Sequence, residues 1–253
     1  MLTALTRAVS PSIARCELTH LARAPIDLDL AARQHDAYEA ALRAAGCTVV
    51  RLRPEPDLPD SVFVEDAAVV FDELAVLTRP GAASRRSETA SVREALSRYR
   101  TLAGIADPGT LDGGDVLVAG RTVFVGAGGR SNDEGIAQFA AILAPFGYRV
   151  VPVTTTGCLH LKSAATLASD SVVLVNPAWV DPAAFRPLEA MPIDGSEPFA
   201  ANALRVGAQL LHGASHSRTR GLLERRGFNV AAVDLGELAK AEGALTCCSL
   251  LIA

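Results

Sequence analysis

The amino-acid sequence predicts an α/β protein in which one strand–strand–helix–strand unit recurs around a shared core. The first observation behind this prediction is a pattern that occurs three times: an amphipathic helix ends at a glycine, and a short apolar strand follows. Gly46, Gly147 and Gly227 suit the left-handed position just past the C-terminus of a helix. The pattern occupies residues 41–52 (ALRAAGCTVVRL), 142–153 (ILAPFGYRVVPV) and 222–233 (LLERRGFNVAAV).

The second observation is that pairs of short apolar strands, broken by turns, lie before or between these helices. The pairs span residues 61–81, 115–128, 164–178 and 202–215. A unit of this size cannot cover its own apolar face, so we expect four or five units to form a ring. No linker or low-complexity stretch divides the chain, and we expect residues 1–253 to form one domain.

An ordinary doubly wound α/β domain is the alternative to the ring. Nucleotide-binding domains of that class carry a glycine-rich phosphate loop after a first strand. Residues 126–130 (GAGGR) lie between an expected strand and an expected helix, yet they fit neither the dinucleotide pattern nor the P-loop pattern. The sequence therefore favours the ring.

Composition excludes several functional classes. The net charge of −4, with the charges interspersed, gives no reason to expect nucleic acid or an acidic membrane surface as a partner. The chain has no apolar run of membrane-spanning length, and its N-terminus has no uninterrupted apolar segment typical of a secretory signal. Five cysteines at irregular spacing do not form a disulfide framework. We expect a soluble, cytoplasmic protein with reduced thiols.

The segment DSVFVEDAAVV (60–70) is the first candidate site. Apolar residues alternate with the period of a strand, and then Glu65 and Asp66 interrupt the pattern before another apolar run. Buried acids need cations or hydrogen-bond donors. Together with Asp60 they indicate a site for a cationic ligand, and the alternative is a hairpin turn with solvated acids.

Two loops of small residues place arginines just before expected helices. Arg85 and Arg86 lie in TRPGAASRRSE (78–88), and Arg130 lies in GAGGRSNDEG (126–135). A planar guanidinium in such a loop can bind a carboxylate through two hydrogen bonds. The alternative is that these side chains are simply solvated at the start of a helix.

Between these loops, Asp112 and Asp115 flank the Gly113–Gly114 pair in LDGGDVLVAG (111–120). Paired glycines allow the backbone to approach a ligand closely, although a bulge or turn before a strand is an equally simple interpretation. Further on, TTTGCLHLKSAATL (154–167) is expected to place His160 just inside an apolar strand. This histidine is the best placed of the five, and the alternative is a core or turn residue.

The thiols of Cys247 and Cys248 lie in TCCSLLI, close to the end of the chain. Neighbours on a strand point to opposite faces, so we expect one thiol to face a pocket and the other to pack in the core. This arrangement argues against a metal clamp made by the pair. Cys158 and His160 form a half-site for zinc that would need two further ligands.

Six segments taken in order resemble one family, the dimethylarginine dimethylaminohydrolases. They are DSVFVEDAAVV, TRPGAASRRSE, LDGGDVL, VFVGAGGRSN, LHLKSAATL and LTCCSLLI. The resemblance extends from CELTHL near the N-terminus to the last strand. It implies the five-bladed αβ propeller of the guanidine-modifying (pentein) superfamily, which agrees with the ring predicted from the repeats.

The resemblance also implies roles for individual residues. It makes Cys247 the nucleophile, His160 the general acid and base, and Asp112 the carboxylate partner of the histidine. The substrate guanidinium is expected at Asp66 with Glu65 beside it, and the substrate α-carboxylate at Arg85 and Arg130. Its α-amino group is expected at Asp60 and the carbonyl of Leu18, and Ala241, where relatives usually have a larger residue, is expected to line the mouth.

The implied reaction is hydrolysis of asymmetric dimethylarginine, and of monomethylarginine, to citrulline and the methylamine through an S-alkylthiouronium on Cys247. It needs no metal or organic cofactor, and the protein is expected to be a monomer or homodimer. Three alternatives stay open: an arginine deiminase-like hydrolase, a non-catalytic propeller that binds a partner, and a zinc protein using Cys158, His160 and Cys247.

Overall fold

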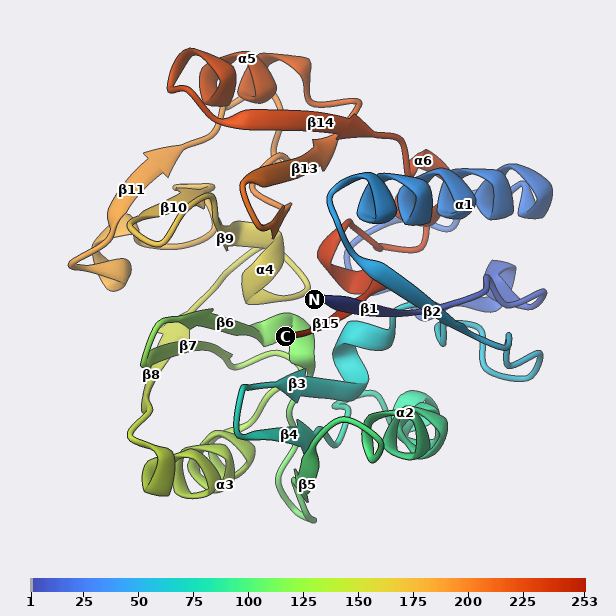
Figure 1. Ribbon diagram of the computed structural model, residues 1–253, viewed down its shortest axis with the longest axis vertical. Helices are drawn as coiled ribbons and strands as arrows, with labels where there is room; N and C mark the ends of the chain where they lie inside the picture. The colour runs from blue at the N-terminus through green and yellow to red at the C-terminus, as the bar shows by residue number, and fades with distance from the viewer. Residues whose placement is uncertain (1) are drawn as a thin grey trace.

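Five three-stranded sheets form a ring in the computed structural model, which describes residues 2–253 (Figure 1). In each sheet the middle strand pairs antiparallel with one neighbour and parallel with the other. The parallel pair is joined by a crossover, which contains an α-helix in four of the five units. The predicted strand–strand–helix–strand ring is therefore confirmed.

Four units follow one another along the chain, and each is a sheet with its crossover. The second to fifth sheets are β3 (Ala68–Val70), β4 (Leu74–Leu77) and β5 (Thr101–Gly104); β6 (Val116–Ala119), β7 (Thr122–Ala127) and β8 (Arg149–Thr154); β9 (Ala165–Leu167), β10 (Val172–Val175) and β11 (Glu189–Pro192); and β12 (Ala203–Val206), β13 (Gln209–Gly213) and β14 (Asn229–Val233). The crossovers contain α2 (Thr89–Leu96), α3 (Asp133–Leu143) and α5 (Ser217–Arg225), and in the β9–β11 unit only the 3-10 turn η6 (Pro182–Phe185).

The two ends of the chain share the remaining sheet, which closes the ring. Strand β1 (Thr3–Arg7) pairs in parallel with β2 (Thr48–Leu52) after helix α1 (Leu28–Ala44), and antiparallel with the final strand β15 (Leu250–Ile252). Figure 1 shows both termini near the middle of the ring. The last strand of the chain therefore supplies the first strand of the first unit.

Neighbouring sheets share their hydrophobic cores, which is the physical reason for the ring. Leu5 and Leu250 of the first sheet pack in one cluster with Ala75 and Leu77 of the second. Four further clusters join the second to the third sheet, the third to the fourth, the fourth to the fifth and the fifth back to the first. Since each unit buries its apolar faces against its neighbours, the fold depends on all five.

The three glycines of the repeated helix–strand pattern have the left-handed conformation that the sequence predicts. Their φ angles are 95° at Gly46, 77° at Gly147 and 84° at Gly227, and a β strand begins two residues later in each case. The turn from helix to parallel strand is thus the same in three of the five units.

Short helical turns lie before the first strand of several units, where the sequence analysis expected strands or loops. They are η2 (Val64–Ala67), η4 (Gly113–Asp115), α4 (Leu161–Ala164) and η7 (Thr246–Cys248); the other short elements are η1 (Ile13–Arg15), η3 (Ala83–Glu88), η5 (Ala144–Phe146) and α6 (Gly236–Ala239). The strand expected at 62–65 is therefore wrong. His160 caps α4 rather than lying inside a strand, and Cys247 and Cys248 lie on a 3-10 turn.

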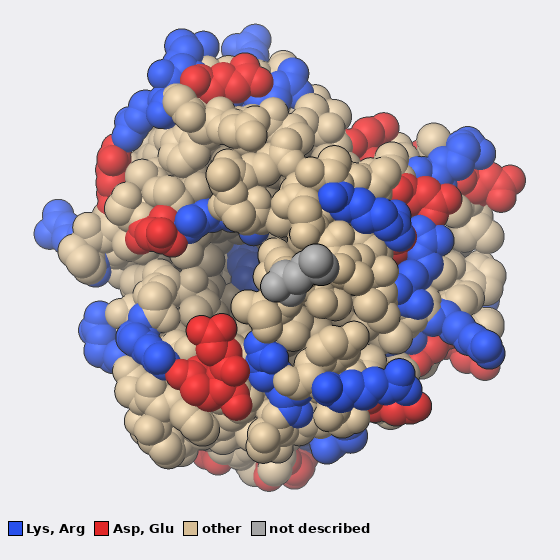
Figure 2. Space-filling view, viewed as in Figure 1, with Lys and Arg blue, Asp and Glu red and all other residues tan. Residues whose placement is uncertain are grey.

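The outer surface carries basic and acidic side chains side by side. On the face shown in Figure 2 they alternate around the rim, and the surface is hollowed near its centre with basic atoms at the floor of the hollow. Within residues 2–253, the helices are too short or too polar to span a lipid bilayer.

Candidate active site

The candidate site lies where the units meet at the inner side of the ring. The segment just before the first strand of each unit enters this region, and each such segment contributes polar side chains. Those side chains are Glu65 and Asp66 before β3, Asp112 and Asp115 before β6, His160 and Lys162 before β9, Asn202 before β12 and Cys247 before β15. The repeat therefore builds the site by using the same position of the unit five times.

A small pocket brings most of the predicted site residues together. Its cavity volume of about 20 Å³ has room for roughly one water molecule. The residues that line it include Asp60, Asp66, Arg85, Arg130, His160, Ala241 and Cys247 from the sequence prediction, together with Glu17, Phe63, Leu159, Glu242 and Gly243. This volume is too small for an amino acid, so a larger ligand fits only if one of the pocket walls moves.

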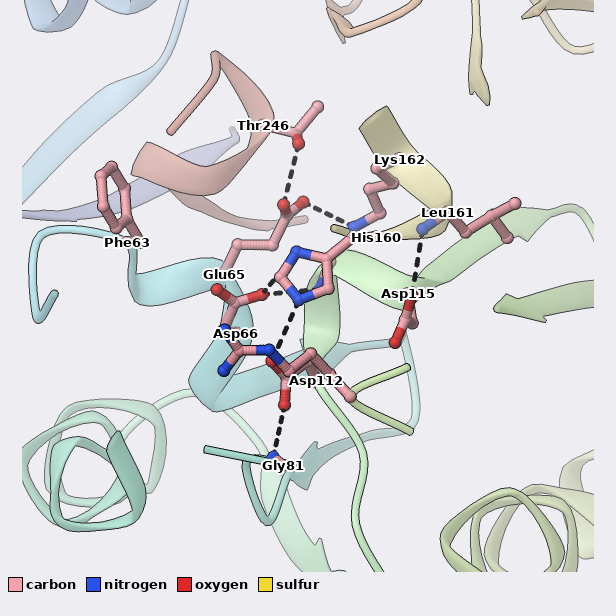
Figure 3. A network of polar contacts seen from close by, with 12 residues as sticks. Phe63, Glu65, Asp66, Gly81, Asp112, Asp115, His160, Leu161, Lys162 and Thr246 are labelled. Atoms are coloured by element: carbon pink, nitrogen blue, oxygen red, sulfur yellow. Dashed lines mark hydrogen bonds and ion pairs between the residues drawn. The ribbon is translucent and has the colours of Figure 1, made fainter. Parts of the chain in front are cut away.

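His160 lies between two buried carboxylates (Figure 3). Its Nε2 lies 3.0 Å from Oδ2 of Asp112, and its Nδ1 lies 3.9 Å from Oδ1 of Asp66. Burial disfavours the imidazolium, but Asp66, the hydrogen bond with Asp112 and the nearby Asp115 outweigh burial and raise the pKa of His160 to about 9. The histidine is therefore a proton donor at neutral pH.

Backbone amides and a serine hold the two carboxylates of the 111–120 segment in place. Gly81 donates its N–H to Oδ1 of Asp112, and the Ser131 hydroxyl donates to Oδ2 of Asp115. Oδ1 of Asp115 accepts the N–H of Leu161 and so fixes the residue after His160. Burial raises the pKa of Asp115 to about 6 against the opposing effects of His160 and Ser131.

Glu65 points away from Asp66 toward the turn that carries the thiols (Figure 3). Its carboxylate accepts hydrogen bonds from Nζ of Lys162 at 2.5 Å and from the hydroxyl of Thr246 at 2.8 Å. Burial raises its pKa, and Lys162 opposes that effect. Glu65 does not line the pocket as described; it contacts Thr246, the residue before Cys247.

Asn202 completes this network from the fifth sheet. Its amide donates to the Thr246 hydroxyl and to the carbonyl of Lys162, and its Oδ1 accepts the N–H of Thr246. The sequence analysis missed Asn202, Lys162 and Thr246. The available signal was their place in the repeat, because each lies in the segment that precedes the first strand of a unit.

The two predicted carboxylate-binding arginines differ in their surroundings. Arg85 is buried, and its guanidinium donates to Asp66 at 2.6 Å, to Glu88 at 2.9 Å and to the carbonyls of Asp60 and Phe63. Arg130 is more exposed and donates Nη2 to the hydroxyl of Thr19. Arg85 therefore fixes Asp66, while Arg130 has the more accessible guanidinium.

Arg85 also sets the charge of its acidic partners. Burial raises the pKa of Asp66, but the charges of His160 and Arg85 and the Arg85 hydrogen bond outweigh that effect and lower it to about 2. Burial raises the pKa of Glu88 to about 7, although Arg85 opposes the rise. Asp66 is thus an anion at neutral pH.

Only one of the adjacent thiols reaches the pocket. Cys247 is partly buried and lines it, whereas Cys248 is fully buried in the core between the fifth and first sheets. The predicted division of the pair is confirmed, but a 3-10 turn and not strand alternation produces it. Burial, with the charges of Glu65 and Asp66, raises the pKa of Cys247 above its ordinary value, so the thiol keeps its proton in the empty pocket.

A loop formed by residues 17–24 borders the pocket through Glu17, whereas His20, Leu21, Ala22 and Ala24 line a second cavity beside it. The N–H of Glu17 donates to Oδ2 of Asp60 at 3.0 Å, and burial raises the pKa of Asp60. Leu18 is partly buried and packs against the core between the fifth and first sheets. Leu18 is not among the residues that line the pocket, so the role expected for its carbonyl stays a prediction.

The zinc alternative of the sequence analysis is not supported by the positions of the cysteines. Cys158 lines a neighbouring cavity of about 440 Å³, which shares Leu159, Glu242 and Gly243 with the pocket. Its thiol donates to the carbonyl of His160. Among the described residues, the one group of three ligating side chains that converges is Asp66, Asp112 and His160. Since that group includes neither cysteine, the structure does not bring Cys158, His160 and Cys247 together as metal ligands.

Comparisons with known proteins identify relatives in the family that the sequence resembles. Residues 22–180 match the model of a family described as eukaryotic N,N dimethylarginine dimethylhydrolase. An N(G),N(G)-dimethylarginine dimethylaminohydrolase of Streptomyces coelicolor is 45% identical over 248 residues, which cover 98% of this chain and 95% of the relative. The enzyme of the same name from Pseudomonas aeruginosa is 34% identical over 226 residues, which cover 88% of this chain and 89% of the relative.

Solved structures of such enzymes have the same fold. A cysteine-to-serine mutant of the Pseudomonas aeruginosa protein, complexed with citrulline, superposes over 100% of both chains with a TM-score of 0.92 and 31% identity. A histidine-to-glycine variant of a dimethylarginine dimethylaminohydrolase, as an adduct with S-methyl-L-thiocitrulline, has a TM-score of 0.93 and 32% identity over 100% of both chains. The five-bladed propeller predicted from the sequence is thus the fold of these relatives.

Proposed function

The chain belongs to the dimethylarginine dimethylaminohydrolase family of hydrolases, and on that premise we propose that it converts asymmetric dimethylarginine to citrulline and dimethylamine. Monomethylarginine is the second substrate in this proposal, with methylamine as its product. The observation that carries the proposal is the pocket in which charged His160, anionic Asp66 and the Cys247 thiol meet.

Opposite charges at the two ends of the pocket suit a zwitterionic amino acid with a cationic tail. Asp66, held by Arg85, attracts the guanidinium of the substrate and places its carbon near the sulfur of Cys247. Arg130 binds the α-carboxylate, and Asp60 with the carbonyl of Leu18 accepts hydrogen bonds from the α-amino group. Arg85 reaches the α-carboxylate only if it gives up a hydrogen bond to one of its buried partners.

The cation of the substrate activates the nucleophile. In the empty pocket, burial and the neighbouring acids keep the Cys247 thiol protonated. A guanidinium bound at Asp66 offsets those negative charges and favours the thiolate, so the thiol releases its proton to solvent. Glu65, tied to Thr246 and Lys162, holds the turn that presents the sulfur and keeps a negative charge beside the bound cation.

Hydrolysis then proceeds in two halves. The thiolate attacks the guanidinium carbon, and the tetrahedral adduct breaks its C–N bond as His160 donates a proton to the departing dimethylamine. An S-alkylthiouronium on Cys247 remains. Neutral His160 takes a proton from water, and the resulting hydroxide attacks the same carbon. The C–S bond then breaks to release the thiolate, and the hydroxyl proton of the adduct passes to solvent, where dimethylamine takes it up, to leave citrulline. Proton transfer of this kind accelerates reactions by typically ~10²–10⁴-fold.

A citrulline assay tests the proposal. Wild-type protein and the variants Cys247→Ser and Cys248→Ser are assayed with arginine, monomethylarginine, asymmetric dimethylarginine and symmetric dimethylarginine. We expect wild-type protein to prefer the asymmetrically dimethylated substrate and Cys247→Ser to be inactive. Mass spectrometry of rapidly quenched wild-type protein should show the thiouronium on the peptide that contains Cys247.

Cys248→Ser is the matched control, because it removes the neighbouring thiol, which is buried away from the pocket. It should keep most of the activity. Activity in Cys247→Ser with loss in Cys248→Ser would assign the nucleophile to the other cysteine, and a preference for unmethylated arginine would refute the proposed substrate.

A further inference from the structure

Glu242 makes an unusual set of contacts with loop 17–24, which borders the pocket through Glu17. Its carboxylate accepts hydrogen bonds from three consecutive backbone amides: Thr19 at 3.0 Å and 3.1 Å, His20 at 2.5 Å and Leu21 at 2.6 Å. Charge-assisted bonds of this kind are about twice as strong as neutral ones. One side chain from the end of the chain thus holds a segment more than 200 residues earlier in the sequence.

The backbone holds Glu242 in a fixed position. Its φ angle is 58°, and among residues 2–253 it is the one residue other than glycine with a positive φ. That conformation is costly for a glutamate and persists where the surroundings impose it. Gly243, which follows, packs so closely on the Phe63 ring that a Cβ atom would lie 2.2 Å from a ring carbon. The position of the carboxylate is therefore set by the chain around it.

The same contacts fix the direction of the Leu18 carbonyl. The Leu18 C=O and the Thr19 N–H belong to one planar trans peptide, so they point in opposite directions. Because the Thr19 N–H donates to Glu242, the Leu18 carbonyl points away from Glu242 within the same peptide plane. The preceding amide is held as well, since the N–H of Glu17 donates to Asp60.

We propose that Glu242 is a positioning residue that holds loop 17–24 beside the pocket, between Glu17 of its lining and Thr19 on Arg130, and so fixes the Leu18 carbonyl for the α-amino group of the substrate. The inference rests on the proposed function for the identity of that amino group. The pocket has room for about one water molecule, so a wall moves when the substrate enters, and in this proposal the loop opens as its amides leave Glu242. When the loop closes again, the three amides return to the carboxylate and the carbonyl returns to its position.

The effect should appear in substrate affinity rather than in chemistry, because Glu242 is expected to touch neither the guanidinium nor the thiol. We expect Glu242→Ala to raise KM for asymmetric dimethylarginine about 10- to 100-fold, the scale of one or two hydrogen bonds to a charged group, and to change kcat less than about threefold. Glu242→Gln keeps one acceptor oxygen and should lie between Glu242→Ala and wild type.

An analogue without the α-amino group separates positioning from general loosening. For N,N-dimethylguanidinovaleric acid, the Leu18 carbonyl has no partner, so Glu242→Ala should weaken binding much less than it does for the amino acid. Glu237→Ala is the matched control, since Glu237 is also a carboxylate that accepts a backbone N–H from the N-terminal region, at Asp27, away from the pocket. It should leave both KM values unchanged.

A readout that does not require turnover tests the loop directly. Iodoacetamide should alkylate Cys247 faster in Glu242→Ala than in wild type, and trypsin should cleave faster after Arg23 within the loop. These two results do not depend on turnover. If the citrulline assay showed no activity while both results were observed, the proposed function would be refuted and the role of Glu242 in holding the loop would stand. Unchanged alkylation and cleavage, or an equal loss of affinity for the amino acid and its deaminated analogue, would overturn the role of Glu242.

Discussion

The pKa of His160 offers the sharpest quantitative test of the proposed mechanism. The substitution is Asp112→Asn, which keeps the size of the side chain but removes the charge of the hydrogen-bond partner 3.0 Å from Nε2. Asp112 is fully buried and receives the N–H of Gly81 on its other oxygen. The asparagine can keep the contact with Gly81, so the substitution should alter mainly the pKa of His160.

The expected change in the pKa of His160 can be worked out from the groups around the imidazole. A pKa of about 9 lies about 2.5 units above the ordinary 6.5, which corresponds to about 3 kcal/mol in favour of the imidazolium. Asp66, Asp112 and Asp115 share this effect against the cost of burial. A hydrogen bond to a charged group contributes ~1.5–3 kcal/mol, so the loss of the Asp112 carboxylate should lower the pKa by about 1–2 units.

Two measurements check this value. The chemical shifts of labelled histidine, followed against pH, give the pKa of His160 in the free enzyme, and the high-pH limb of kcat/KM gives the pKa of the essential acid. In Asp112→Asn both should move from about 9 toward about 7–8. Because the folded-state pKa is raised, the stabilisation by charged His160 is complete below about pH 6.5 and disappears as the pH rises through about 9.

Asp115→Asn is the comparison variant. Asp115 acts on His160 through space alone, whereas Asp112 acts through both its charge and a hydrogen bond, so the loss of Asp115 should lower the pKa of His160 less than the loss of Asp112. A histidine pKa in Asp112→Asn within about half a unit of wild type would refute the assignment of Asp112 as the partner that keeps His160 charged.

Two further predictions concern glycines that lie against the site. In Gly114→Ala the new Cβ would lie 2.5 Å from Nδ1 of His160 and 2.8 Å from Oδ1 of Asp66, so the imidazole must shift. We expect kcat to fall about 100-fold. Activity within threefold of wild type would contradict the packing. Gly243→Ala would place a Cβ 2.2 Å from the Phe63 ring. It should lower the free energy of unfolding, measured by urea titration, by ~1–3 kcal/mol. The double variant that also carries Phe63→Leu should recover part of that stability.

The repeated part of the fold could be predicted from the sequence because it follows local rules. A helix that ends at Gly46 and an apolar strand directly after it need only capping and periodicity to be recognised, and the same holds at Gly147 and Gly227. The fourth unit gave a weaker signal, since its crossover contains the 3-10 turn Pro182–Phe185 in place of a longer helix. Closure by β15 followed from the ring itself, since the first unit otherwise lacks a strand.

The geometry of the site was less accessible from the sequence. Val62, Val64 and their neighbours alternate like a strand, but η2 forms there because its residues turn inward to contact η4 and η7 of other units. The partners of Glu65, which are Lys162 and Thr246, come from positions 97 and 181 residues away. Spacing along the chain gives no information on such contacts, and only the equivalence of the units could have suggested them.

The charge arrangement explains how a poorly reactive thiol can serve as the nucleophile of the proposed reaction. Burial, with the charges of Glu65 and Asp66, raises the pKa of Cys247, so in the proposed reaction the thiol stays protonated until the substrate binds. The same acids attract a guanidinium, and the bound cation removes the electrostatic cost of the thiolate. His160 stays charged because Asp66 and Asp112 hold its proton, so the proton donor is ready before the thiolate forms. Acids placed for recognition thereby delay activation until a cationic substrate is bound, and a neutral ligand such as citrulline should leave the thiol protonated.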